Sequence, residues 1–142
     1  MAKLTRQQAN ALLLDGVHLD VQDGAAVHGL LERQFEAAVR HRTAELTTLA
    51  EQLTPLLDAM EARRQQRVSL VRALFGPEGG MDQFFATLEA GARAQAQAAW
   101  QELETIVTAC KQATTRNASL LAEQYSVMQR VLHGEEAIYA PR

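Results

Sequence analysis

The sequence predicts an all-α protein: an elongated antiparallel helical bundle, a coiled-coil-like hairpin of long helices with short N-terminal and connecting helices. The chain is rich in Ala, Leu, Gln, Glu and Arg, residues that favour helices. Aromatic residues make up 5% of the chain and β-branched residues are scattered along it, which argues against a sheet. Apolar residues recur at steps of three and four over most of the 142 residues, a length that suits one domain, residues 1–142.

The first part of the chain predicts two helices, at about residues 6–22 and 25–41. Thr5 with Gln8 three residues later forms a capping box, which marks a helix start near Arg6. Asp23-Gly24 combines a cap-preferring residue with one that weakens helix interiors, so we expect a kink or break near residue 23. The cations of Arg40-His41-Arg42 suit the C-terminus of the second helix.

A third helix is predicted at about residues 44–75, with Thr43 as its cap. Pro55 leaves two alternatives open: the helix kinks there, or it restarts with Thr54 as cap and Pro55 in the first turn. The helix carries a seam of alternating three- and four-residue steps in which two arginines replace apolar residues. The seam is Leu46, Leu49, Leu53, Leu56, Met60, Arg63, Arg67, Leu70 and Leu74.

The segment Gly76-Pro77-Glu78-Gly79-Gly80 is the clearest break in the sequence, because three glycines and a proline in five residues cannot propagate a helix. A short helix at about 82–89, capped by Asp82, should follow, and Gly91 marks the place where it ends or bends. The last helix is predicted at about residues 92–133. The tail, 134–142, is expected to be non-helical.

The last helix has an apolar face that widens toward its C-terminal end. A heptad count from Trp100 gives two mostly apolar rows, and a third row beside them is wholly apolar. Tyr125 and Leu132 widen the face further in the final turns, while Asn117 and Gln124 interrupt the seam itself. The helix is therefore asymmetric along its length.

Composition and charge point to protein partners. The chain has 14 Lys and Arg against 17 Asp and Glu, so it lacks the basic field that attracts nucleic acid. The apolar run near the N-terminus is cut short by Asp15, which excludes a signal peptide or a membrane span there and indicates the cytoplasm. Cys110 is the only cysteine, which excludes an internal disulfide and suits a reducing compartment.

Residues that could carry chemistry have simpler interpretations. His28, Glu32 and Glu36 share one helical face and could in principle hold a metal, but glutamates four residues apart are ordinary helix surface. Cys110 falls on the apolar stripe with no histidine nearby in sequence, which indicates a packing residue. We therefore expect no enzyme activity, no metal and no cofactor.

Two other features have both a functional and a structural interpretation. The basic patch could dock an acidic partner or nucleic acid, but the acidic total and the absence of interleaved aromatic residues favour a solvated or intramolecularly paired face. This patch consists of Arg63, Arg64, Arg67 and Arg72. Trp100 begins the apolar stripe of the last helix, and we expect it to be a core anchor.

The last helix also carries a recognisable series of short motifs. They are Trp100-Gln101-Glu102-Leu103, then Arg116-Asn117-Ala118-Ser119-Leu120-Leu121, then Gln129-Arg130-Val131-Leu132, and finally Ile138-Tyr139 in the tail. In this order they resemble the FlgN family, flagellar type III export chaperones for hook-associated (hook-filament junction) proteins. The resemblance implies a cytoplasmic chaperone that prevents premature assembly of its clients and delivers them to the export gate, without a cofactor.

Amphipathic client helices can be covered by helix-in-groove packing, and we place that contact on the widened apolar face. The predicted partner-binding residues are Asn117, Leu120, Leu121, Gln124, Tyr125, Met128 and Leu132, with Tyr139 as the candidate for the export gate by resemblance. We expect no nucleic acid partner and no stable membrane insertion. The alternatives are a structural helical adaptor or a homodimer in which the C-terminal stripe pairs with itself.

Overall fold

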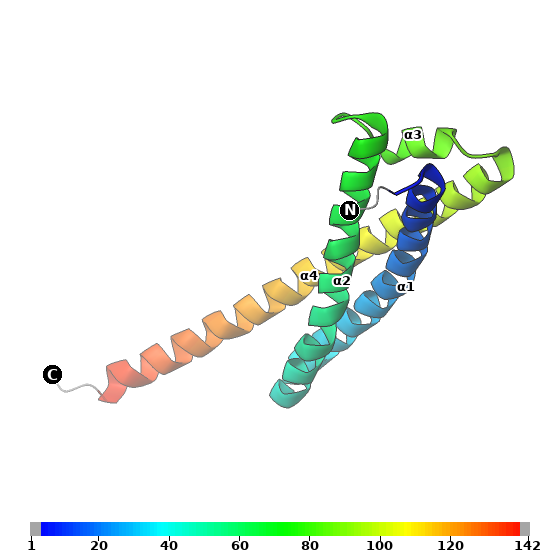
Figure 1. The fold of residues 1–142 in the computed structure, drawn as a ribbon. Coiled ribbons are helices and arrows are strands. Elements are labelled where there is room, and N and C mark those ends of the chain that lie inside the picture. The colour runs from blue at the N-terminus through cyan, green and yellow to red at the C-terminus, as the bar shows by residue number, and fades with distance from the viewer. Residues whose placement is uncertain (1–3, 140–142) are drawn as a thin grey trace.

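The computed structural model describes residues 4–139, with side chains described through Gly134. It confirms the all-α prediction. Four helices follow one another, α1 (Arg6–Val39), α2 (Thr43–Phe75), α3 (Met81–Ala86) and α4 (Ala90–Tyr139), and the described residues include no strand. Figure 1 shows α1 and α2 as an antiparallel hairpin, α3 across its open end, and α4 running back along the hairpin and beyond it.

Helix α1 is continuous from Arg6 to Val39, so the predicted break near residue 23 is wrong. The capping box at its start is confirmed, since the Thr5 hydroxyl accepts from the Gln8 backbone N–H at 3.0 Å. Asp23-Gly24 stays helical because tertiary contacts use both residues. Asp23 pairs with Arg63 of α2, and Gly24 lies against Ile106 of α4.

Helix α2 is also continuous, and Pro55 lies inside it. The Thr54 hydroxyl donates to the Ala50 carbonyl at 2.9 Å, so Thr54 does not restart the helix as a cap. The predicted cap at Thr43 is wrong as well: the N-cap is Arg42, and Thr43 is the first helical residue. His41 in the preceding turn has φ 56°, which reverses the chain sharply after α1.

The break at residues 76–80 is confirmed. Gly76 has φ 91°, and a Cβ on Gly79 would lie 2.9 Å from the Gly76 carbonyl oxygen, so the turn needs glycine at both positions. Asp82 is not the cap of α3. The helix begins after Gly80, whose backbone N–H donates to the Gln83 side chain at 2.9 Å, and it ends at Ala86 rather than near residue 89.

Helix α4 is longer than predicted at both ends. Gly91 lies inside its first turn, and the helix continues through Gly134 to Tyr139, which corrects the non-helical tail for residues 134–139. A single glycine costs a helix only about 1 kcal/mol, and Glu135, Glu136 and Ala137 are adequate helix formers. The glycine therefore does not end this helix.

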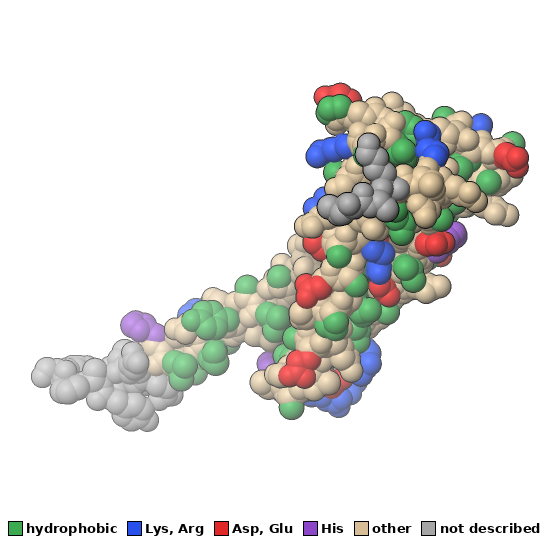
Figure 2. Space-filling view, in the orientation of Figure 1, with side chains coloured by type: hydrophobic (Ala, Val, Ile, Leu, Met, Phe, Trp, Pro, Cys, Tyr) green, Lys and Arg blue, Asp and Glu red, His purple; other side chains and the backbone are tan. Residues whose placement is uncertain are grey.

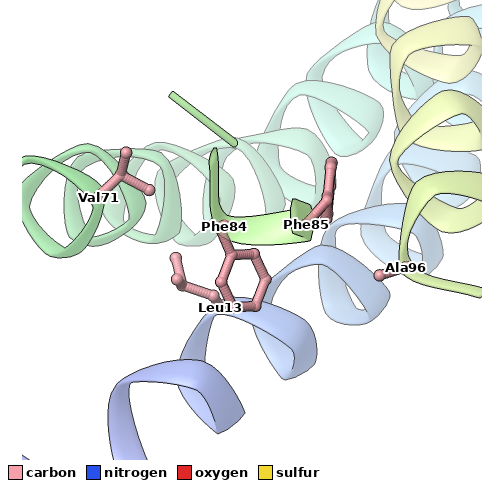
Figure 3. Packing of buried hydrophobic residues seen from close by; sticks show 5 residues of the cluster. All are labelled: Leu13, Val71, Phe84, Phe85 and Ala96. Atoms are coloured by element: carbon pink, nitrogen blue, oxygen red, sulfur yellow. The ribbon is translucent and has the colours of Figure 1, made fainter. Parts of the chain in front are cut away.

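The core consists of three apolar clusters along α1. At the α3 end, Leu13 of α1, Val71 of α2, and Phe84 and Phe85 of α3 pack together with Ala96 of α4 (Figure 3). Further along, Val17 packs with Leu103, and Val27 and Leu31 pack with Leu53 and Ala113. Helix α1 contacts both α2 and α4, whereas no Cα of α2 lies within 8 Å of a Cα of α4 in the described residues.

A buried ion-pair cluster explains the two arginines in the α2 seam. Asp20 of α1 is buried and accepts hydrogen bonds from Arg63 and, at 2.8 Å, from Arg67. Burial by itself would lower the pKa of the Arg63 guanidinium, but its hydrogen bonds to Asp20 and Asp23 raise the pKa overall. Arg67 also lies 5.3 Å from the centre of the Trp100 ring, so the cluster links all three long helices.

Candidate binding surface on the C-terminal helix

The end of α4 presents an apolar stripe to solvent. Leu121, Tyr125, Met128 and Leu132 are 38%, 60%, 50% and 54% exposed, and steps of four, three and four residues place them on one face. We call these four residues the distal stripe. Figure 2 shows hydrophobic side chains along this projecting part of the helix. Large apolar side chains that stand exposed together on one face often mark an interaction site, so the distal stripe is a candidate for binding a partner.

Asn117 and Gln124 face the bundle and fix α4 to α1. The Asn117 amide is buried, 2% exposed, and donates to the Leu31 carbonyl and the Gln34 side chain, both at 2.8 Å. The half-buried Gln124 donates to the Ala38 carbonyl at 2.9 Å, close to the end of α1. These two residues therefore position the distal stripe, and their polar groups are already used inside the molecule.

Arg116 strengthens the same attachment, a role that its place in the sequence did not predict. Its guanidinium lies 4.1 Å from the centre of the Phe35 ring and 3.1 Å from a carboxylate oxygen of Glu32. It also donates to the Asn117 side-chain oxygen at 3.1 Å. Its position directly before the seam residue Asn117 was the available signal, but both partners on α1 are more than 80 residues away in sequence.

The two remaining predicted residues lie differently. Leu120 is half-buried, on the side of α4 that turns toward α1. Tyr139 is the last residue of α4, and its side chain lies outside the described part of the structure.

A groove of about 480 Å³ joins the distal stripe to the turn between α1 and α2. We call it the distal groove. Its α4 side includes Leu121, Tyr125 and Met128, and its other side includes His41 and Leu46. The sequence did not indicate that this turn contributes, because only the folded hairpin brings residues 41–46 beside residues 121–128. The arrangement can accept an apolar helix between α4 and the turn.

The residues considered for chemistry serve the structure. Glu32 pairs with Arg116, and Glu36 pairs with Arg40 at 2.8 Å. In the part of the chain that the structure describes, no three His, Cys, Asp or Glu side chains gather to hold a metal. Cys110 is half-buried, and burial raises the pKa of its thiol, which makes it a poor nucleophile.

The arginine patch is largely paired within the molecule, as expected. Arg63 and Arg67 bind Asp20, and Arg64 binds Glu61 on the surface of α2. The hydrogen bond from Arg64 lowers the pKa of Glu61 to about 2.

No helix among the described residues is apolar over a length that could cross a membrane.

Comparison with known protein families assigns the chain that carries this surface to a family. A family model described as FlgN protein matches residues 25–133, which is most of the chain. The chain belongs to the FlgN family. FlgN proteins are flagellar export chaperones, and the matched region includes both the attachment of α4 to α1 and the distal stripe. No curated protein and no solved structure matches the chain.

Proposed function

We propose that this FlgN family member is a cytoplasmic, non-enzymatic chaperone that binds hook-associated (hook-filament junction) proteins, prevents their premature assembly and delivers them to the type III export gate. The observation that carries the proposal is the distal stripe, because four large apolar side chains stand uncovered on a helix that projects beyond its own bundle. A chaperone needs such a surface to be present before its client arrives.

The distal groove supports this role. An amphipathic client helix laid along α4 would cover the distal stripe on one side and contact Leu46 and His41 on the other. Fully burying a leucine- or methionine-sized side chain contributes roughly 1.5–3 kcal/mol, so a few such contacts can support binding after the cost of ordering the client. The hydrogen bond from Gln124 to Ala38 attaches the α4 wall of the groove to the end of α1, next to the turn that forms the other wall.

The charged side chains near the end of α4 lie away from the distal stripe, which leaves the stripe open to a client helix. Between Asn117 and Leu132 the only charged residues are Glu123 and Arg130. At about 100° per residue they lie on the side of α4 opposite the distal stripe. Covering the stripe therefore buries no charge of the chaperone. By family resemblance Tyr139, at the end of the same helix, is our candidate for contacting the export gate.

The test is capture of a purified hook-associated protein by the wild-type chain and by the triple variant L121S, Y125S and M128S. We expect capture to fall at least about tenfold, since each truncation removes a buried apolar contact worth more than about 1 kcal/mol. The matched control is L4S with L19S, which removes one exposed leucine just before α1 and one inside it, both outside the distal stripe, and should leave capture unchanged. Helical content measured by circular dichroism should be equal in all three proteins. Undiminished capture by the triple variant would favour a structural adaptor.

A further inference from the structure

A second, larger groove runs along the middle of the molecule, between α2 and α4, with α1 as its floor. Its volume is about 630 Å³, and Leu57, Met60, Leu103, Val107 and Cys110 are among its apolar lining residues. We call it the medial groove. It exists because α2 and α4 both pack on α1, while no Cα atom of one lies within 8 Å of a Cα atom of the other in the described residues. Leu57 is 49% exposed at its edge, so the groove is an incompletely covered apolar surface.

The medial groove lies in line with the distal groove, because α2 and α4 run antiparallel along α1 (Figure 1). The distal groove joins residues 43–46, at the start of α2, to residues 121–128 of α4. The medial groove joins residues 57–67 of α2 to residues 103–115 of α4. Toward α3, residue numbers therefore rise along α2 and fall along α4 in step, and a helix that lies in one groove points along α1 toward the other.

One face of α4 contributes to both binding regions. Leu103, Val107, Cys110 and Thr114 line the medial groove with steps of four, three and four residues. The distal stripe repeats these steps 18 residues later, which is about five full helical turns. A client that covers the distal stripe can therefore follow the same face of α4 into the medial groove.

One uncompensated cation stands at the edge of the medial groove. Of the five charged residues that line it, four are paired within the molecule, Asp20 with Arg67 and Glu61 with Arg64. The fifth, Lys111, is exposed and forms no ion pair with the described residues. The groove thus combines apolar walls with a free positive charge on its α4 side. Charge complementarity favours an occupant that carries a carboxylate beside an apolar face.

We propose that the medial groove holds a second segment of the hook-associated client, an amphipathic helix of about three turns with an acidic residue beside Lys111. This inference rests on the proposed function and extends it from one client contact to two. The helix lies beside α1, α2 and α4 and completes a four-helix arrangement, in which its apolar face meets Leu57 and Val107. About 12 client residues span the distance from Leu103 to Thr114, at ~1.5 Å per residue.

Two linked contacts explain how a small open surface holds its client. Once the distal stripe is occupied, the second client segment is tethered nearby, and its binding to the medial groove becomes intramolecular. Each contact alone is weak, so capture falls when either one is lost.

Cys110 reports directly on the medial groove, because it is the chain's only cysteine and lines that groove. Alkylation of its thiol by iodoacetamide is followed by mass spectrometry of the chain, with and without a saturating amount of purified hook-associated protein. We expect the client to slow alkylation at least about fivefold, since the rate depends on access to the thiolate. Leu121 is about 16 Å away along α4, so a client held by the distal stripe alone leaves this rate unchanged.

The matched control for this measurement is G29C in a C110A background. Gly29 is exposed on α1, and an added Cβ there meets nothing within 4 Å. It is not among the lining residues of either groove, so the client should not slow alkylation of this cysteine. Equal protection at both positions would mean general shielding of the chain and would overturn the medial contact.

Substitutions at the edges of the groove test its share of the affinity. L57D places a charge on the apolar edge and should weaken capture at least about tenfold. Its control is L19D, because Leu19 is 47% exposed and lines neither groove. K111E should weaken capture about threefold to tenfold at low salt and less at high salt, where exposed charges are screened. R33E makes the same change in net charge at an exposed position of α1 and should bind as the wild type does.

The outcomes separate this inference from the proposed function. Capture of the client with an unchanged alkylation rate at Cys110, or with equal affinities for L57D and L19D, would overturn the medial contact and leave the distal contact standing. Equal affinities for K111E and R33E would overturn the acidic residue beside Lys111. Failure of the wild type to capture the purified hook-associated protein would overturn both the medial contact and the proposed function.

Discussion

At the scale of single residues, Gly24 of α1 lets α4 approach closely because it has no side chain. A Cβ at this position would lie 2.7 Å from the Cγ2 methyl of Ile106, closer than carbon atoms approach in proteins. Ile106 is β-branched and stiff at χ1, so it cannot swing away freely. The Cys110 thiol also lies 3.6 Å from the Gly24 carbonyl oxygen, which shows how closely the two helices pack here.

Replacing Gly24 with alanine should therefore destabilise the protein. Overpacking costs roughly 1–3 kcal/mol, whereas the gain in helix propensity is about 1 kcal/mol. The control is G29A in the same helix, where an added Cβ meets nothing within 4 Å, so this variant should be more stable than the wild type. Urea unfolding measures both. Equal stabilisation of the two variants would mean that Ile106 adapts and that the close approach is unimportant.

Individual residues also show how much of the fold could be predicted from the sequence. The arginines in the α2 seam are unusual in an apolar stripe, and the sequence favours a solvated or intramolecularly paired face for them. Their partner Asp20 lies 43 and 47 residues away in the chain, so only the fold could identify it. Asp23-Gly24 was interpreted as a break because its local preferences favour one. An ion pair and a close helix contact reverse that preference, and neither is visible in a local window.

At the scale of the elements, α2 tolerates a proline in its interior. Pro55 cannot donate a backbone hydrogen bond to the carbonyl of Glu51, and its ring crowds that carbonyl. Leu49 and Leu53 are buried just before it, so packing against α1 holds the helix together across this point. The continuity of α2 is therefore a tertiary effect, which explains why the sequence left a kink and a restart both open.

The substitution P55A should raise the unfolding free energy by about 1–3 kcal/mol, because it restores a backbone hydrogen bond at an exposed position. D58A, at an exposed position less than one turn later, serves as the control for helix propensity alone and should add no more than about 0.7 kcal/mol. Thermal and urea unfolding compare the three proteins. A neutral or destabilising P55A would show that the proline is accommodated without cost.

Helix α4 shows the limit of predicting a binding surface from one helix. Its widened apolar face was predicted correctly from the heptad rows, and the distal stripe is exposed as that prediction requires. Asn117 lies in the same part of the helix but points into the bundle. The difference depends on which side of α4 faces α1: Asn117 and Gln124 lie on that side and bond to α1, whereas the distal stripe lies beside it. Helix periodicity does not contain that information.

At the scale of the whole molecule, the residues that form the core and the residues of the projecting end of α4 are different parts of the chain. All buried residues of the three core clusters lie between Leu13 and Ala113. Among the described residues, Gln124 is the last residue of α4 whose side chain forms a hydrogen bond with α1. Residues after Tyr125 therefore add apolar surface to the molecule without adding to its core.

Removing residues 126–142 should consequently leave stability almost unchanged while abolishing capture of a hook-associated protein. We expect the unfolding free energy to change by less than about 1 kcal/mol, as for changes outside the core. It should be measured at low micromolar concentration, where self-association contributes least. Removing 135–142 alone is the control, because it keeps the distal stripe and should preserve capture. A large loss of stability in the longer truncation would place the projecting segment within the folding unit, and the distal stripe could then no longer be regarded as a surface reserved for partners.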